Sequence, residues 1–312
     1  MEREGFKYHW WGKGDIDASF GIFFDGFSKI LTATGIMTMV FGMPARIVIG
    51  KVVPGIGLAI FLGNLWYFYE ARQLAIRERR QDVTSQPFGI GASQLSGWLY
   101  LIIGPVYWQT KDAELAFQVG LAAAFIGGMV EIAGGFAGRW IIDNIPNCAL
   151  MGNMASSAMV WLSIVGLAMV FDKPVYGLLP LFIIIIDYLG KADKRFAKIP
   201  SGVAAILIGT AVAWAGGYQT WERFEQSFAS IGFYPPSLSA GDILAGFKGI
   251  VPFLPVIIPL QINNFLSTLQ GLESARMAGD TYPERRSMIM DGVSTIAGSL
   301  FGNPFPTTVY FG

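Results

Sequence analysis

The stretch Gln261-Ile-Asn-Asn-Phe-Leu-Ser-Thr-Leu-Gln-Gly-Leu-Glu273 decides how this chain is interpreted, because it places amides, hydroxyls and a carboxylate on an otherwise apolar helical segment. A second polar run, Asn303-Pro-Phe-Pro-Thr-Thr-Val-Tyr310, contains prolines that prevent it from continuing as a helix. Polar groups and helix breakers are costly at membrane depth, and they persist mainly where they line a cavity or pair inside a bundle. The pattern therefore predicts a substrate pathway inside a membrane bundle rather than a simple anchor.

The remainder of the chain has the composition of a membrane protein. Of its 312 residues, 53% are hydrophobic and 14% are charged, whereas a soluble domain carries about 25% charged residues. The 39 glycines and 16 prolines fit closely packed, locally broken membrane helices. The formal net charge is zero, so there is no basic field to attract nucleic acid.

Residues that commonly carry catalytic or metal chemistry are scarce. Cys148 is the only cysteine and His9 the only histidine. Disulfide frameworks, cysteine- or histidine-rich metal sites and catalytic triads therefore lack their usual parts. We expect no enzyme activity, no metal and no organic cofactor.

Nine segments are interpreted as membrane spans, since a helix needs roughly 20 mainly apolar residues to cross a bilayer. They lie at about 20–42, 46–69, 86–108, 115–138, 146–171, 175–189, 199–216, 249–272 and 287–302. Lys and Arg are concentrated in the N-terminal stretch and in the loops at 70–85, 190–198 and 276–286, which nine alternating spans place on one side. The positive-inside rule then predicts a multi-pass protein of the plasma or inner membrane with a cytoplasmic N-terminus.

Two segments have the pattern of non-helical backbone inside the membrane. They are Thr84-Ser-Gln-Pro-Phe-Gly-Ile90, which leads into the third span, and Asn303–Tyr310, which follows the ninth. Proline removes an N–H donor and biases its predecessor toward extended conformations. Interrupted segments in corresponding positions of two halves point to a transporter binding site, whereas the plainer interpretation is a loop at a helix end.

Several of these runs resemble one known family. Glu273-Ser-Ala-Arg-Met-Ala-Gly-Asp280, Asp291-Gly-Val-Ser-Thr-Ile-Ala-Gly-Ser-Leu-Phe-Gly302 and Pro306-Thr-Thr-Val-Tyr310 are similar to the xanthine/uracil/vitamin C permeases, which belong to a nucleobase–cation symporter superfamily that includes hypoxanthine/guanine permeases. Ser85-Gln-Pro-Phe-Gly-Ile90 is similar to the third-span motif of that superfamily. The motif-level similarity covers about residues 84–90 and 259–311.

The resemblance implies an all-α polytopic membrane protein with a seven-plus-seven inverted-repeat transporter fold. In that fold the third and tenth spans each begin with a short strand, and the two strands meet near the bilayer midplane. The half-helices that follow direct their N-termini at the substrate, and their free N–H groups suit the carbonyl oxygens of a nucleobase. The family also suggests a homodimer.

The resemblance further divides the chain into parts of a core domain and a gate domain. Residues 1–145 would hold spans one to four of the core, and 146–217 would hold spans five to seven of the gate. Residues 218–247 would be a linker, and 248–312 would hold spans eight and nine and the start of the tenth. The family's remaining spans would follow Gly312, so we expect a fold that is incomplete at the C-terminus and a chain that is a fragment of a fourteen-span protein or a truncated product.

Candidate site residues come mainly from the family motifs. The substrate-binding candidates are Gln86, Phe88, Asn263, Asn264, Thr268, Thr307 and Thr308. Their amides and hydroxyls donate and accept hydrogen bonds, as the edge of a purine or pyrimidine requires, and Phe88 offers a ring for stacking. The plainer interpretation is hydrogen bonding between helices, worth roughly 0.6 kcal/mol per contact, and ordinary packing for Phe88.

Charged residues within the spans are candidates for ion coupling. Glu273 and Asp291 are the two coupling candidates. Alternatively, Glu273 is a helix-end charge facing Arg276, and Asp291 ties the ninth span to the core. Asp25 and Lys29 lie four residues apart and are expected to form a structural pair along the first span. Glu131 is a further intramembrane carboxylate.

These observations predict a secondary active transporter of a nucleobase-like solute such as xanthine, uracil or hypoxanthine, driven by protons or sodium through alternating access. The chain departs from the family, because Asn264 or Asn263 replaces a glutamate of the eighth span and no acidic residue stands near Phe311. Two alternatives stay open. One is an anion carrier of the sulfate or bicarbonate type on the same fold, and the other is a non-transporting membrane scaffold.

Overall fold

The computed structural model describes residues 8–10, 12, 15–146, 148–149, 152, 155–156, 159–190, 201–228 and 232–310. The chain divides into two compact units, one formed by Met1–Ser156 with Tyr234–Gly312 and the other by Ser157–Phe233. The first boundary lies close to the expected end of the first core segment at residue 145. The segment expected to be a linker, 218–247, contains one helix assigned to each unit, and the division into core and gate domains stays a prediction.

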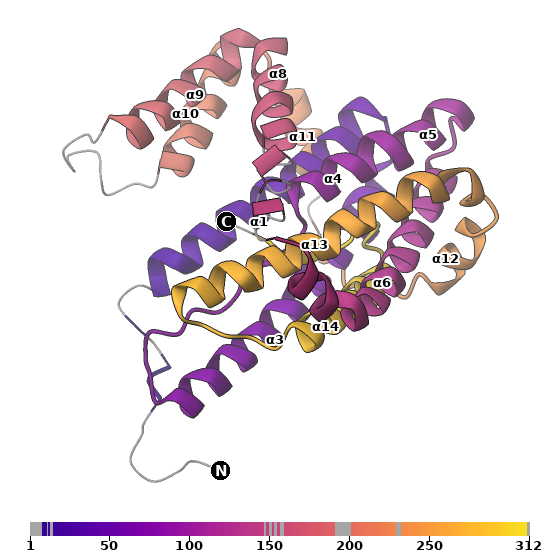
Figure 1. The fold of residues 1–312 in the computed structure, drawn as a ribbon. Coiled ribbons are helices and arrows are strands. Elements are labelled where there is room, and N and C mark those ends of the chain that lie inside the picture. Colours follow the sequence, from indigo (N-terminus) through magenta and orange to yellow (C-terminus); the bar gives the residue numbers. More distant parts are fainter. Residues whose placement is uncertain are drawn as a thin grey trace. The chain divides into compact units, whose positions relative to one another are not determined.

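The first unit is helical apart from two short strands. Its elements, shown in Figure 1, are α1 (Asp15–Gly35), η1 (Ile36–Val40), α2 (Ala45–Ile47), η2 (Val48–Val52), α3 (Val53–Glu78), β1 (Phe88–Gly89), α4 (Ala92–Trp98), η3 (Leu99–Ile103), α5 (Gly104–Thr110), α6 (Ala113–Asn144), α12 (Ala240–Gly246), η5 (Val251–Phe253), α13 (Leu254–Ala278), α14 (Glu284–Leu300) and β2 (Thr308–Val309). The second unit contains η4 (Met159–Ile164), α8 (Val165–Asp172), α9 (Pro174–Leu189), α10 (Ser201–Ala215) and α11 (Trp221–Phe228). The segments η1 to η4 are π-helical and η5 is a 3₁₀ turn. The π-helical segment η3 joins α4 to α5, so these three elements form one continuous helical stretch.

Three helical segments within the described residues are long and apolar enough to cross a membrane, namely Ala45–Glu78, Ala113–Asn144 and Val251–Ala278. The segments Pro174–Leu189 and Ser201–Ala215 are shorter apolar helices. Helical backbone is present within each of the nine predicted spans, and the nine-span count and the orientation stay predictions.

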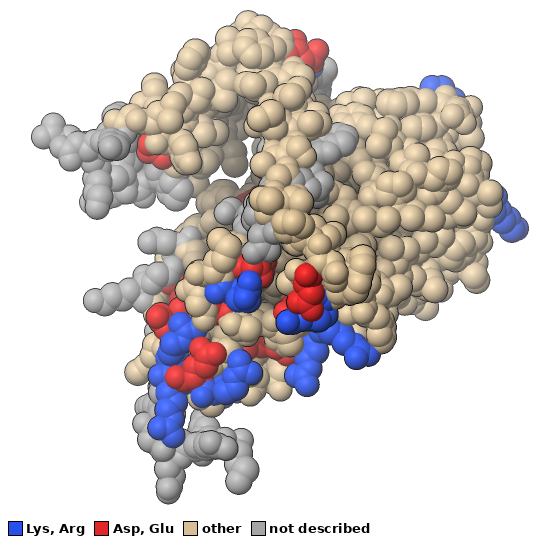
Figure 2. Space-filling view, in the orientation of Figure 1, with Lys and Arg blue, Asp and Glu red and all other residues tan. Residues whose placement is uncertain are grey.

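Charge and apolar surface are separated along the first unit. Figure 2 shows its charged side chains gathered mainly at one end, where α3, α6 and α13 end. The ion pairs at this end include Arg80–Asp280 at 2.5 Å, Arg276–Glu273 at 2.5 Å and Arg139–Asp143 at 3.1 Å. Large exposed apolar side chains occupy the flanks of α3 and α6, among them Phe61, Leu65, Phe136 and Trp140. This distribution is typical of helices with lipid on their flanks and water at their ends.

Helix α6 forms the centre of the first unit and packs closely against α14. Of its most apolar stretch, 61% is buried, against 33% and 28% for the other two candidate spans. A Cβ added to Gly128 would lie 2.7 Å from the carbonyl oxygen of Gly292, and one added to Gly292 would lie 2.6 Å from that of Gly128. Glycine at both positions therefore lets the two helix backbones approach, as small residues do in membrane bundles.

The two interrupted segments meet. β1 and β2 pair antiparallel, with Phe88 opposite Val309 and Gly89 opposite Thr308. The backbone N–H of Tyr310 extends the pairing by donating to the carbonyl of Pro87 at 3.1 Å. Prolines on both segments exclude helix there, so each backbone finds its partners on the other. The predicted meeting of the two extended segments is confirmed.

The segment that leads into β1 is held by the loop between α13 and α14. Arg80 forms an ion pair with Asp280 at 2.5 Å, and the other carboxylate oxygen of Asp280 accepts from the backbone N–H of Thr84 at 3.0 Å. The phenol of Tyr282 donates to the carbonyl oxygen of Thr84 at 2.5 Å. Burial, and then the negative charge of Asp280, raise the pKa of Tyr282 above its ordinary value.

Tyr282→Phe is expected to lower the free energy of unfolding by about 1 kcal/mol at neutral pH, because it deletes one hydrogen bond to Thr84. The folded state raises the pKa of Tyr282. The stabilisation that its hydroxyl gives the folded state is therefore complete below the pKa that tyrosine has in the unfolded chain, about 10, and is lost as pH rises further. Thermal unfolding between neutral and strongly alkaline pH should show a shallower alkaline decline in this variant. Tyr69→Phe is the matched control because its ring is 49% exposed, and an equal loss in both variants would contradict the prediction.

Candidate functional site

The polar residues of the family motifs converge in the interior of the first unit. Together with two polar residues from α3 and α6 they form a cluster, called here the buried network, in which every member is 0% exposed. Its members are Tyr67, Glu131, Gln261, Asn264, Thr268, Asp291, Thr295, Thr307 and Thr308.

Asp291 connects three elements to α14. Its carboxylate accepts hydrogen bonds from the phenol of Tyr67 on α3, from Oγ1 of Thr268 on α13 at 2.5 Å and from the backbone N–H of Val309 on β2 at 3.1 Å. These are the contacts expected if Asp291 ties the ninth predicted span to the core, which was the alternative to a role in ion coupling. The carboxylate also supplies the partner that the N–H of Val309 requires.

Thr308 of β2 and Thr307, which directly precedes it, are held by side chains from α13 and α14. Thr295 accepts from the backbone N–H of Thr307 at 3.0 Å, and the Oγ1 of Thr308 lies 2.7 Å from that of Thr268. The carbonyl oxygen of Thr307 accepts from Nδ2 of Asn264 at 3.3 Å. The predicted site residues Asn264, Thr268, Thr307 and Thr308 are therefore brought together, and in this conformation they hydrogen-bond one another.

Glu131 faces α13 from α6. Its carboxylate accepts from Nδ2 of Asn264 at 3.1 Å and from Nε2 of Gln261 at 3.3 Å. From the sequence, Glu131 could be recognised only as an intramembrane carboxylate. Its hydrogen-bond partners could not be predicted, because they lie 130 and 133 residues away along the chain. Gln261 was not among the predicted site residues.

Two predicted site residues make the contacts expected from the plainer of the two interpretations given for each of them. The ring of Phe88 is 0% exposed. It packs beside Tyr67 at a centroid distance of 5.6 Å, and a Cβ on Gly63 would be 2.0 Å from it. Phe88 therefore offers no free ring face for stacking. Glu273 pairs with Arg276 through bonds of 2.8 and 2.5 Å, the contact expected of a helix-end charge, and its role in ion coupling stays a prediction.

A pocket of about 300 Å³ opens beside the strand pair, and we call it the strand pocket. Its lining residues are Thr84, Ser85, Gln86, Pro87, Gly271, Ser274, Ala275, Ala278, Asp280 and Tyr310. Gln86 thus has the location expected of a contact residue. Asn263 is half-buried and lies outside both this lining and the buried network.

A buried ammonium group lies at the end of β2. Lys29 and Asp25 on α1 form the ion pair that their spacing predicted, and the Lys29 side chain is 11% exposed. The Nζ of Lys29 also lies 3.6 Å from the ring centroid of Tyr310, which directly follows β2 and lines the strand pocket. The spacing of Asp25 and Lys29 indicated the pair, whereas the contact with Tyr310 follows only from the fold.

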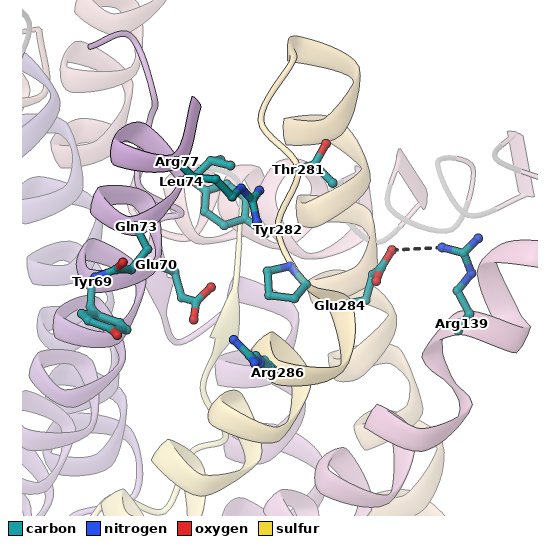
Figure 3. A pocket seen from close by; sticks show the side chains of 11 residues that line it. Tyr69, Glu70, Gln73, Leu74, Arg77, Arg139, Thr281, Tyr282, Glu284 and Arg286 are labelled. Carbon is teal, nitrogen blue, oxygen red and sulfur yellow. Dashed lines mark ion pairs between the residues drawn. The ribbon is translucent and has the colours of Figure 1, made fainter. Parts of the chain in front are cut away.

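A second pocket, of about 560 Å³, lies at the charged end and is shown in Figure 3. Its charged lining residues include Glu70, Arg77, Arg139, Glu284 and Arg286, with an ion pair of 3.7 Å between Arg139 and Glu284. Acidic and basic groups offset each other there, and none of the predicted site residues lines it. The strand pocket is therefore the better candidate site.

Comparison with known proteins identifies a fold but no family. No protein-family model matches the chain, and no curated protein matches it. The solved transmembrane domain of a cyanobacterium bicarbonate transporter, BicA, is similar with a TM-score of 0.54 and 15% sequence identity. The similarity covers 93% of this chain and 74% of that one. Together with the apolar helices, it shows a membrane protein with the fold of a transporter domain. The seven-plus-seven repeat and the permease family stay predictions.

Proposed function

We propose that this chain is the membrane domain of a secondary active transporter that binds a small solute beside the β1–β2 pair and works by alternating access. The observation that carries the proposal is the antiparallel pairing of two interrupted segments among apolar helices. Non-helical backbone at membrane depth is tolerated where it is buried in protein or lines a cavity. In inverted-repeat transporters such broken segments form the substrate site.

The groups around the strand pair suit a solute that presents oxygen atoms. The helical segment after β1 begins at Ala92 behind Gly91, which provides no side-chain cap. Its first backbone N–H groups are therefore directed toward the strand end, where the helix dipole is positive. Lys29 and Gln86 add side-chain donors near the same strands.

A small anion of the bicarbonate or sulfate type is the substrate class that we favour. An ammonium group has three donor hydrogens, and Lys29 directs them at Asp25 and at the face of Tyr310. An anion that enters the site could share these donors while Asp25 keeps the site from accumulating positive charge. The likeness in fold to a bicarbonate transporter domain also supports this choice.

A nucleobase such as xanthine, uracil or hypoxanthine is the second candidate. The specific observation in its favour is the resemblance of the motifs in 84–90 and 259–311 to nucleobase permeases. Gln86 in the strand pocket supplies both a donor and an acceptor, which a heterocycle with mixed edges requires.

A ligand screen with Lys29 variants tests the proposal. Bicarbonate or sulfate is expected to raise the melting temperature of the purified full-length protein, because a ligand of the folded state stabilises it. Uptake into proteoliposomes should be saturable and should collapse with the ion gradient. Lys29→Met should weaken anion binding by about 10-fold or more, since a charge-assisted hydrogen bond contributes roughly 1.5–3 kcal/mol, and Lys29→Arg should retain part of it.

The double variant Asp25→Asn/Lys29→Met is the control for folding, because it removes both members of the ion pair. It should fold like the wild type and still fail to bind anions. Stabilisation by xanthine or uracil and not by anions would select the second candidate. No response to either class, in a protein that remains folded, would reject the transport proposal.

A further inference from the structure

Glu131 places a carboxyl group in the most buried part of the first unit. Its side chain is 0% exposed. In the part of the chain that the structure describes, no lysine, arginine or histidine forms an ion pair with it, and the carboxylate of Asp291 is near enough to repel it. A buried carboxylate without a counter-charge is strongly unfavourable. The group is therefore expected to be neutralised, either by a proton of its own or by a bound cation.

Two buried oxygen atoms beside Glu131 also lack partners. They are Oε1 of Gln261 and Oδ1 of Asn264, both on side chains that are 0% exposed. The nitrogen of each amide donates to Glu131, so each orphaned oxygen lies next to the carboxylate. Oε1 of Gln261 approaches α6 closely, since a Cβ on Gly127 would be 2.6 Å from it. Flipping either amide would turn its oxygen toward the carboxylate and increase the repulsion.

We propose that Glu131, Gln261 and Asn264 form a binding site for a sodium ion between α6 and α13. The ion would supply the missing positive charge and would accept the two orphaned amide oxygens as ligands. Asn264 also donates to the carbonyl oxygen of Thr307, so the ion site is connected to the residue that directly precedes β2. The role of this ion as the coupling ion rests on the proposed function, whereas its binding does not.

The donor set favours a monovalent hard cation, for which we take sodium, over a divalent ion or a proton. Carboxylate and amide oxygens are ligands for hard cations. Glu131 is the one carboxylate of the proposed ligand set, and among the described residues there is no group of three or more His, Cys, Asp or Glu side chains that could hold a metal ion, which suits a monovalent ion better than a divalent one. A proton on Glu131 would neutralise the carboxylate but could satisfy only one of the two orphaned oxygens.

Thermal unfolding of the purified full-length protein in sodium chloride or choline chloride, at equal ionic strength, tests the inference. The melting temperature of the wild type should rise with sodium concentration and saturate, with no such response to choline. Glu131→Gln should lose this response and should be at least as stable as the wild type in choline, because it removes the uncompensated charge. Gln261→Leu keeps the carboxylate and should need roughly 10-fold more sodium for the same shift.

Glu114→Gln is the matched control on the same helix. It also removes a carboxylate, but Glu114 pairs with Arg46 at 3.0 Å and Lys51 at 3.3 Å, about 25 Å along α6 from Glu131. Its sodium response should equal that of the wild type. A wild type insensitive to sodium, or an undiminished response in Glu131→Gln, would overturn the inference. A sodium response without any solute binding would reject the transport proposal and leave the ion site supported.

Discussion

Replacement of Asp291 by alanine is expected to cause a large loss of stability in the first unit. The carboxylate accepts from Tyr67, Thr268 and Val309, all of them buried. Tyr67 and Thr268 retain second partners in Ser287 and Thr308, whereas among the described residues the N–H of Val309 has no other acceptor. A buried donor left without an acceptor costs roughly 1–3 kcal/mol, so that with the two weakened contacts we expect a total of about 3 kcal/mol.

The loss is a substantial part of the roughly 5–15 kcal/mol by which a folded domain is stable. Relief of the repulsion between Asp291 and Glu131 would offset some of it. The measurement is the yield of monodisperse protein after extraction, together with its melting temperature. Asp291→Asn keeps one acceptor oxygen and should be intermediate.

Val293→Ala is the control for the Asp291 variants. It lies two positions further along α14, and its side chain is 42% exposed. We expect it to behave nearly as the wild type does. If Asp291→Ala were as stable as Val293→Ala, the carboxylate would not hold β2 in the way that its hydrogen bonds indicate.

Gly55→Ala should be the second strongly destabilising substitution. A Cβ at this position would lie 2.4 Å from the backbone nitrogen of Asn303 and 2.6 Å from the backbone of Phe301 and Gly302. These are backbone atoms of the turn that leads to β2, so they cannot rotate away as a side chain would. Overpacking of this kind costs roughly 1–3 kcal/mol, or more where the backbone must move.

Gly57→Ala, on the same helix, provides the comparison. A Cβ at Gly57 would have nothing within 4 Å, and alanine is favoured over glycine inside a helix by up to about 1 kcal/mol. Gly57→Ala should therefore match or slightly exceed the wild type in melting temperature, while Gly55→Ala falls well below it. Equal melting temperatures for the two variants would show that α3 does not approach the turn as closely as the structure has it.

Structural properties that depend on residues close together in the sequence were predictable. Apolar length predicted nine helical segments, and helical backbone is present within each of them, whereas α11 and α12 lie in the stretch predicted to be a linker. Proline in Thr84–Ile90 and in Asn303–Tyr310 predicted extended backbone, because a missing N–H and a fixed φ act on the segment that contains them. The four-residue spacing of Asp25 and Lys29 predicted their ion pair for the same reason.

The roles of individual polar residues were less predictable. Phe88 and Glu273 each had two interpretations, and the choice depended on whether a distant side chain or a neighbouring charge would be in contact. For Phe88 the deciding neighbours are Tyr67 and Gly63 on α3, which cover its ring. No periodicity in the sequence records such a contact.

The sequence by itself therefore determined that this chain forms apolar helices broken at two extended segments, since hydrophobicity and proline geometry are local properties of the chain. The resemblance to a known family predicted that the two breaks meet, but only the tertiary structure decided their register, that Asp291 holds β2, and that Glu131 lies against the orphaned amides of Gln261 and Asn264. Each of these contacts joins residues on different secondary-structure elements, and their energy depends on burial, which exists only once the elements have packed.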